Sequence, residues 1–268
     1  MELGVTLRNM GAESEASVIS RCAKLAEGAG LESLWITDHV AIPPDDAEGS
    51  GGRYVDPLIT LAWIAGATDR IRLGTGVLIL PYRGALMTAR QVASLQELSE
   101  GRVLLGVGIG WMDAEFRVLG LDRRQRGSTS DETLQILNSC FDSDEVELNG
   151  QRFLFKPRPK KPPVLVGGRA PHALQRAARF GDGWIPMGLE PERVSELRDQ
   201  YHGYCERAGR PAGSITIMGG LPLNDVARSR ALLDAYRDVE TERFVCGMRY
   251  ETVDDYERQI GVLQNLIK

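Results

Sequence analysis

Residues 71–81 (IRLGTGVLILP) constrain the fold more than any other part of this chain of 268 residues. The segment is too apolar and β-branched for a surface strand, so it predicts a strand that is buried on both faces. Yet Gly74 and Gly76 stand where side chains should pack, and glycine weakens a strand unless a bulge or an approaching ligand requires it. Residues 103–111 and 163–168 are also apolar runs that contain glycines. We therefore predict a flat ligand that lies against bare backbone at one end of a parallel sheet.

Apolar runs with a period of two alternate along the chain with amphipathic runs of period 3.6. Strands are predicted at residues 3–8, 33–37, 71–80, 103–108, 164–166, 183–186, 215–218 and 244–246. Helices are predicted at residues 14–29, 56–67, 88–99, 131–141, 171–180, 191–208, 225–237 and 253–267. Strands that are each followed by a helix indicate an α/β protein folded as a (β/α)8 TIM barrel. An open doubly wound sheet is the alternative, because the last two strands are weakly patterned.

Two segments interrupt this alternation. Residues 42–54 are rich in glycine and proline, and we expect a flexible loop that closes over a substrate. Residues 145–155 predict a small hairpin that turns at Asn149-Gly150. We find no internal repeat and no linker, so residues 1–268 are interpreted as one barrel domain with a hairpin insertion.

Composition excludes several classes of function. The formal net charge of −5 offers no basic surface for nucleic acid, and no apolar run is long enough for a membrane helix. The four cysteines are far apart and form no CxxC pair, which favours reduced thiols in a cytoplasmic protein and gives no metal motif. None of the lysines follows a predicted strand, so a Schiff-base aldolase is disfavoured.

In a barrel, functional groups gather at the carboxyl ends of the strands. Two of these ends carry candidates for chemistry. Asp38 and His39 follow the second strand, and His39 is the obvious group for proton transfer because imidazole titrates near neutral pH. Gly167 and Gly168 precede a helix N-terminus, a place that binds phosphate, and Arg169 adds a positive charge. The alternatives are an ordinary capped turn at Asp38-His39 and a tight turn without a ligand at Gly167-Gly168.

Five motifs in order resemble the luciferase-like monooxygenase superfamily, and within it the oxidoreductases that depend on coenzyme F420. They are LWITDH (34–39), LGTGVLILPYR (73–83), GRVLLGVGIGW (101–111), VGG (166–168) and GDGW (181–184), within about the first 200 residues. The resemblance implies a barrel that binds a flavin or deazaflavin, with its ring against a bulge at Gly76-Val77 that in the family often carries a cis peptide. It places Asp38 and His39 near the reactive edge of the ring. It assigns backbone along the coenzyme's side chain to Ile109 and Gly110, and the phosphate loop to Gly167, Gly168, Arg169 and Ala170.

Three departures from the family pattern bear on specificity. The phosphate loop often reads Gly-Gly-Asn-Ser in the family, whereas Arg169 and Ala170 here favour a charged or longer phosphate tail. Trp111 stands where sugar-phosphate dehydrogenases of the superfamily carry a carboxylate, so that activity is disfavoured. Trp111 and Tyr54 instead predict an apolar or aromatic substrate wall. Finally, Gly84-Ala85 replaces a frequent His-Pro pair.

The leading hypothesis is a cytoplasmic oxidoreductase that transfers a hydride between coenzyme F420 and a small, apolar organic substrate. The first alternative is an FMN-dependent monooxygenase, and the second is a non-catalytic flavin-binding barrel. A phosphate-binding isomerase is disfavoured, because we find no glutamate at a strand end to partner His39. The resemblance also implies a possible homodimer.

Overall fold

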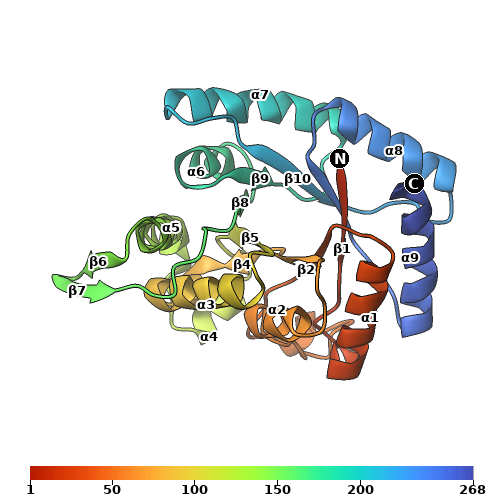
Figure 1. Cartoon of the computed structure of the whole chain (residues 1–268), viewed down its shortest axis with the longest axis horizontal. Helices are drawn as coiled ribbons and strands as arrows, with labels where there is room; N and C mark the ends of the chain where they lie inside the picture. The colour runs from red at the N-terminus through yellow and green to blue at the C-terminus, as the bar shows by residue number, and fades with distance from the viewer. Residues whose placement is uncertain (268) are drawn as a thin grey trace.

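The computed structural model describes residues 1–267 and shows parallel strands that close into a barrel within a ring of helices (Figure 1). The strands pair in the order β3-β2-β1-β11-β10-β9-β8-β5-β4, and a further pairing of β3 with β5 closes the ring. Because β3 and β4 share one position, there are eight strand positions, which confirms the predicted (β/α)8 TIM barrel. The strands are β1 (Glu2–Thr6), β2 (Ser33–Ile36), β3 (Arg72–Thr75), β4 (Leu78–Ile79), β5 (Val103–Gly108), β8 (Val164–Gly167), β9 (Gly183–Ile185), β10 (Ser214–Gly219) and β11 (Arg243–Cys246).

The predicted helices are present, with differences at their ends. The helix predicted at 131–141 begins five residues earlier, at Arg126, and the one predicted at 88–99 begins at Ala85. One six-residue helix, α4, was not predicted, because it is too short to show a helical period. The helices are α1 (Ala16–Gly28), α2 (Pro57–Ala65), α3 (Ala85–Leu98), α4 (Asp113–Val118), α5 (Arg126–Asp142), α6 (His172–Phe180), α7 (Pro191–Arg207), α8 (Val226–Asp238) and α9 (Val253–Ile267).

The predicted hairpin is present and projects from the barrel at the left of Figure 1. Its antiparallel strands are β6 (Glu145–Leu148) and β7 (Gln151–Leu154). Asn149 and Gly150 both have positive φ, 53° and 75°, as a tight two-residue hairpin turn requires.

The single strand predicted at residues 71–80 is wrong, because two short strands replace it. β3 pairs with β2 and β5, whereas β4 pairs with β5 alone. The Gly76-Val77 peptide between them is cis, although neither residue is proline. This strand position is therefore filled by two short strands that both run parallel to β5.

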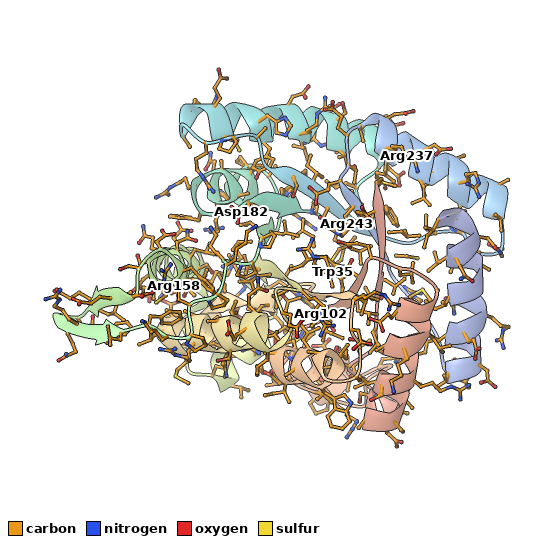
Figure 2. The ribbon with its side chains drawn as sticks, viewed as in Figure 1. Trp35, Arg102, Arg158, Asp182, Arg237 and Arg243 are labelled. Carbon is orange, nitrogen blue, oxygen red and sulfur yellow. The ribbon has the colours of Figure 1, made fainter. Side chains whose placement is uncertain are left out.

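The interior of the barrel explains several of the glycines. Trp35 is fully buried and lies near the centre of the molecule (Figure 2). A Cβ atom on Gly74 would lie 2.3 Å from the Trp35 ring, and one on Gly76 would lie 2.6 Å from the Met218 methyl group. A Cβ on Gly106 would lie 2.0 Å from the Thr75 carbonyl oxygen. Packing within the protein therefore accounts for Gly74 and Gly106, whereas the contact of a flat ligand with backbone at Gly76 stays a prediction.

The amino-terminal end of the barrel is closed by paired charges. Arg243 is 2% exposed, and its Nε and Nη2 donate to the two carboxylate oxygens of Glu32 at 2.7 and 2.8 Å. Its remaining nitrogen, Nη1, donates to the Thr216 hydroxyl at 3.2 Å. A two-pronged ion pair of this kind holds β2 and β11 across β1.

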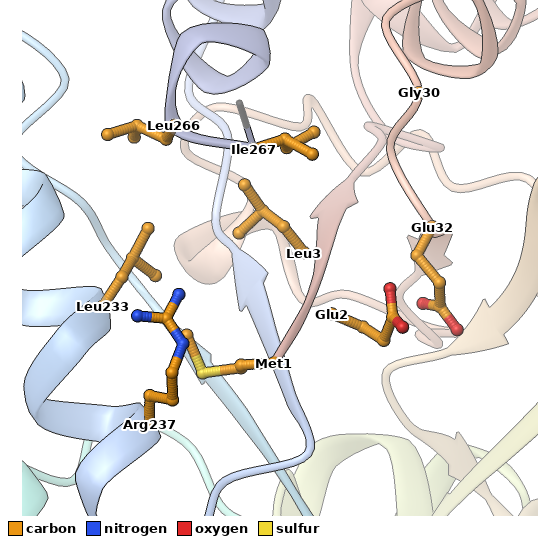
Figure 3. A pocket seen from close by; sticks show the side chains of 9 residues that line it. All are labelled: Met1, Glu2, Leu3, Gly30, Glu32, Leu233, Arg237, Leu266 and Ile267. Carbon is orange, nitrogen blue, oxygen red and sulfur yellow. The ribbon is translucent and has the colours of Figure 1, made fainter.

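A small cavity of about 90 Å³ lies beside this charge network, at the start of β1 and against α8 and α9 (Figure 3). Small-molecule sites usually enclose about 300–1,000 Å³, so this cavity is too small for a coenzyme ring. Among residues 1–267, no helix is long and apolar enough to cross a membrane. Within the same residues, no group of three or more His, Cys, Asp or Glu side chains could hold a metal ion.

Candidate active site at the carboxyl end of the barrel

His39 follows β2 and contacts a carboxylate that the sequence interpretation missed. Its Nδ1 lies 3.1 Å from Oε2 of Glu115, in the first turn of α4. The His39 side chain is 18% exposed, whereas that of Glu115 is 0% exposed. The absence of a glutamate at a strand end therefore did not mean that His39 lacks a carboxylate partner. The partner comes from a helix that follows β5, not from a strand end.

The Glu115 carboxylate is held by four donors. Oε1 accepts from the backbone N–H groups of Val40 and Ala41 at 2.6 and 3.0 Å. Oε2 accepts from the Tyr82 hydroxyl at 2.9 Å in addition to its contact with His39. Because the donors come from the loops after β2 and β4, and Glu115 itself follows β5, this carboxylate ties the ends of β2, β4 and β5 together.

These contacts determine the charge of the Glu115 carboxylate. Burial by itself raises the pKa of Glu115, but the hydrogen bonds from Ala41, Val40 and Tyr82, together with His39, bring that pKa below its usual range. The carboxylate is therefore ionised at neutral pH and accepts a hydrogen bond from the Nδ1–H group of the imidazole. This arrangement fixes the histidine tautomer and leaves Nε2 for exchange of a proton with a bound molecule.

Asp38 is also buried, but it faces other partners. Its carboxylate accepts from the Ile79 N–H at 2.8 Å and from both terminal nitrogens of Arg83 at 2.6 and 2.9 Å. Arg83 also donates to Asp56, the N-cap of α2. Both oxygens of Asp38 thus hold the β4 turn in place. The contact of Asp38 with a coenzyme stays a prediction.

The two predicted wall residues lie beside His39. The ring centroid of Tyr54 is 5.1 Å from that of His39, and the Trp111 ring meets the imidazole edge-on at 6.3 Å. Trp111 is 66% exposed. Residues from the loops after β2 and β5 therefore form an aromatic rim around the imidazole, and substrate contact there stays a prediction.

The loop at residues 42–54 is attached to residues 8–11, which follow β1. Met10 forms a β-bridge with Tyr54, and Gly11 donates its N–H to the Arg53 carbonyl. Arg8 donates to the Gly49 carbonyl at 2.8 Å. These contacts hold Tyr54 near His39. Closure of the loop over a substrate stays a prediction.

Val77 lies at the carboxyl end of the barrel, and its side chain packs against glycines of the neighbouring strands β5 and β8. A Cβ on Gly108 would lie 2.5 Å from one Val77 methyl group, and a Cβ on Gly167 would lie 3.0 Å from the other. Val77 is half-buried and packs against a cluster of buried side chains inside the barrel: Trp35, Leu104, Leu165, Ile185, Met218 and Val245. The predicted residues Gly76, Val77 and Gly167 are therefore brought together, and a ring against this bulge stays a prediction.

The predicted phosphate loop connects β8 to α6. Gly168 has a φ of +121°, and its carbonyl accepts from the Trp184 indole N–H at 3.3 Å. Among residues 1–267, Arg169 has no acidic partner, and its side chain is exposed. Ala170 and the N-terminus of α6 follow at once. An exposed guanidinium at a helix start fits the anionic side chain of a flavin or deazaflavin coenzyme.

Ile109 and Gly110 lie between β5 and the Trp111 rim. Gly110 has a φ of +76°, and a Cβ there would lie 3.0 Å from Ile79 and from Phe116. This close packing seats α4, and with it Glu115, against β4. Contact of these two residues with the coenzyme's side chain stays a prediction.

Tyr82 and Arg83 were quoted within a family motif but were given no role in the sequence interpretation. The sequence feature that could have identified them as site residues is that two polar side chains follow directly after the apolar run that ends at Pro81. Glu115 offered no such signal, because a glutamate in a charged segment is ordinary on a surface helix.

A family model described as luciferase-like monooxygenase matches residues 1–256. An uncharacterized protein of Mycobacterium tuberculosis (strain ATCC 25618 / H37Rv) is 32% identical over 206 residues, which cover 70% of this chain and 71% of that protein. A 5,10-methylenetetrahydromethanopterin reductase of Methanolobus tindarius is 29% identical over 206 residues, which cover 74% of this chain and 59% of the reductase.

Two solved structures share the fold over nearly the whole chain. An F420-dependent secondary alcohol dehydrogenase in complex with an F420-acetone adduct superposes with a TM-score of 0.84 at 14% identity, covering 99% of this chain and 97% of the other. The oxygenating constituent of 3,6-diketocamphane monooxygenase of Pseudomonas putida, in complex with FMN, has a TM-score of 0.79 at 14% identity. That alignment covers 100% of this chain and 96% of the other.

Proposed function

The chain belongs to the luciferase-like monooxygenase family, and from this premise we propose that it transfers a hydride between coenzyme F420 and a small, apolar organic substrate. Family membership supports the broader assignment as an oxidoreductase. The reductase relative from Methanolobus and the fold shared with an F420-dependent dehydrogenase support the choice of coenzyme.

The single observation that carries the proposal is the His39–Glu115 pair at the carboxyl end of the barrel. A bound deazaflavin supplies the hydride-transfer chemistry. The protein manages the accompanying proton at Nε2 of His39: the neutral imidazole accepts it from the substrate, and the imidazolium returns it in the reverse direction. Glu115 stabilises the imidazolium and keeps the ring oriented.

The surroundings of this pair support an apolar substrate. Tyr54 and Trp111 present aromatic surface beside the imidazole, at ring distances of 5.1 and 6.3 Å. Burial raises the pKa of the Tyr54 hydroxyl, so this group stays neutral. A small apolar molecule between these rings is held mainly by the removal of its surface from water.

An FMN-dependent monooxygenase is the second candidate, and the fold shared with an FMN-bound monooxygenase favours it. Both candidates use the same end of the barrel and the same anion loop. They differ in whether the reduced complex reacts with oxygen.

The test is a titration of the purified protein with coenzyme F420 and, separately, with FMN, followed by absorbance and fluorescence. Tighter binding of F420, and a reduced complex that is stable in air, support hydride transfer. Tighter binding of FMN, and a reduced complex that air rapidly oxidises, favour the monooxygenase. If neither coenzyme binds, both candidates are wrong.

A non-catalytic flavin-binding barrel makes a different prediction in the same assay. It binds coenzyme tightly, and no hydride acceptor or donor from a panel of small alcohols, ketones and enones changes the spectrum of the complex. Turnover by the wild-type protein that His39→Ala abolishes contradicts this alternative.

A further inference from the structure

Tyr82 and His39 donate to the same oxygen of the buried Glu115 carboxylate. The Tyr82 hydroxyl lies 2.9 Å from Oε2 of Glu115, and Nδ1 of His39 lies 3.1 Å from that atom. The other oxygen, Oε1, accepts from two backbone N–H groups of the loop after β2. The tyrosine hydroxyl is therefore linked to the imidazole through a single carboxylate oxygen.

Packing holds the Tyr82 ring in place independently of its hydroxyl. Tyr82 follows Pro81 in the turn Leu80–Tyr82, and its ring meets the Phe116 ring edge-on at 5.1 Å. Phe116 is 1% exposed and directly follows Glu115 in α4. Because the ring packs on the helix that carries the carboxylate, Tyr82→Phe should remove the hydrogen bond and keep this aromatic contact.

The Tyr82 hydroxyl keeps its proton at neutral pH. Burial, together with the hydrogen bond to Glu115, raises the pKa of Tyr82 above its usual 10, and the charges of Asp38 and Arg123 act on it in opposite directions. Although burial raises the pKa of Glu115, its hydrogen bonds lower that pKa overall, so the carboxylate is ionised. A hydroxyl that donates to a carboxylate withdraws charge from the oxygen that also faces His39.

The other charged and titratable groups near His39 have partners of their own. Asp38 precedes His39 in the chain, but both of its oxygens accept from Arg83. Tyr54, in the loop at residues 42–54, presents its ring to the imidazole, and the charge of Arg8 acts on the Tyr54 hydroxyl. The carboxylate on α4 is thus the anion that contacts the imidazole, and Tyr82 acts on that carboxylate.

We propose that Tyr82 is a positioning residue for the proton transfer at His39. By donating to Oε2, it limits how strongly Glu115 stabilises the imidazolium, so that Nε2 can return its proton as well as accept one. The inference rests on the proposed function, in which Nε2 of the neutral imidazole takes the proton from the substrate and the imidazolium gives it back. Without the hydroxyl, the shared oxygen carries more negative charge, and the imidazolium keeps its proton to a higher pH.

The experiment follows the His39 ring signals by NMR as the pH is varied, in the full-length protein, with His39→Ala to assign them. We expect the midpoint of imidazole protonation to rise by about 0.5–1 pH unit in Tyr82→Phe. It should fall in Glu115→Gln, because the stabilising negative charge is lost. In the double variant, Tyr82→Phe should add no further change, since the group that transmits its effect is absent.

A matched control removes a tyrosine hydroxyl from another part of the barrel. Tyr204 lies on the outer helix α7, where its hydroxyl accepts from Gln175 at 3.3 Å. Tyr204→Phe should therefore leave the His39 midpoint at its wild-type value. A ring-fluorinated tyrosine at position 82 keeps the hydroxyl as a stronger donor, so it should lower the midpoint instead.

The same shift should appear in turnover. The pH dependence of kcat/KM reports the essential groups of the free enzyme, so its acid limb should move to higher pH in Tyr82→Phe by the amount that NMR measures. A merely structural role for Tyr82 would lower kcat/KM equally at every pH and leave the limb in place.

The outcomes separate this inference from the proposed function. An unchanged or lowered midpoint in Tyr82→Phe contradicts the role of Tyr82, even where coenzyme F420 binds and turns over. A rise that persists in the Glu115→Gln background also contradicts it. A protein that shows the expected midpoints but binds no coenzyme overturns the proposed function, and the role of Tyr82 in turnover falls with it. Should Tyr82→Phe fail to fold, the fluorinated variant decides, because an unchanged midpoint there is equally contrary.

Discussion

The two ends of the barrel differ in whether all of their arginines are paired within the chain. At the amino-terminal end, Arg243 is buried and all its nitrogens have partners, and Arg72 lies 3.5 Å from the same glutamate. At the carboxyl end, Arg83 is paired with Asp38 and Asp56, whereas the exposed Arg169 has no acidic partner among residues 1–267. A guanidinium paired within the chain stabilises the fold, whereas one left unpaired is available to a ligand.

The carboxylates show the same contrast. Glu32 at the amino-terminal end neutralises Arg243, and both of its carboxylate oxygens accept hydrogen bonds from that guanidinium. Glu115 at the carboxyl end fixes one nitrogen of His39 and leaves the other available. Substitutions at the two ends should therefore affect different measurements: the free energy of unfolding at one end, and turnover or affinity at the other.

The largest effect is expected at His39. The His39→Ala variant should lower kcat/KM by about 10²–10⁴-fold, because the group that moves the proton is lost. The unfolding midpoint should change little, since the imidazole is partly exposed. His202→Ala, on the outer helix α7, is the matched control and should keep full activity. Full activity of His39→Ala would place the proton transfer elsewhere.

Arg243→Met should come next, as a loss of about 3–5 kcal/mol in the free energy of unfolding. The substitution leaves the mostly buried Glu32 carboxylate with only the more distant Arg72 as a partner. Urea denaturation measures the change, and Arg237→Met is the control, because Arg237 is half exposed and, among residues 1–267, pairs only with Asp234 on its own helix. Equal losses in the two variants would contradict the contrast between the ends.

Gly74→Ala should cost about 1–3 kcal/mol of stability by overpacking, without changing coenzyme affinity. The new methyl group would lie 2.3 Å from the Trp35 ring. Gly84→Ala should have no such effect, because a Cβ there meets nothing within 4 Å. Trp35→Phe in the Gly74→Ala background should recover part of the loss. A drop in coenzyme affinity at unchanged stability would restore the sequence-based explanation of Gly74.

The smallest effect is a change of stability with pH that depends on Glu115. Its pKa is lower in the folded protein than the usual 4.5, so its stabilising contribution is complete above that value. The contribution is lost as the pH falls through the folded pKa, because the unfolded chain then takes up the proton first. Denaturation of wild type and Glu115→Gln at decreasing pH measures it, and the gap between them should narrow below about pH 4. Parallel curves would show that Glu115 is not ionised in the fold.

Local sequence patterns predicted most of the architecture. β5 and α9 were predicted at both ends, and the hairpin followed from Asn149-Gly150, because strand period, helix period and turn chemistry are properties of a few neighbouring residues. The prediction of one strand at residues 71–80 was wrong, because β3 and β4 pair with two separate stretches of β5, and such pairing is not visible in the local sequence.

The sequence by itself determined the barrel, the family motifs, and the gathering of His39, Tyr54 and Trp111 at one end, since strand ends of a parallel barrel must meet. Only the tertiary structure decided the partners of those residues. Glu115 is 76 positions from His39, and Gly74 faces a Trp35 that lies on the neighbouring strand. Such contacts depend on how helices and side chains pack across the closed barrel. No local period or spacing in the sequence shows which residues will meet there.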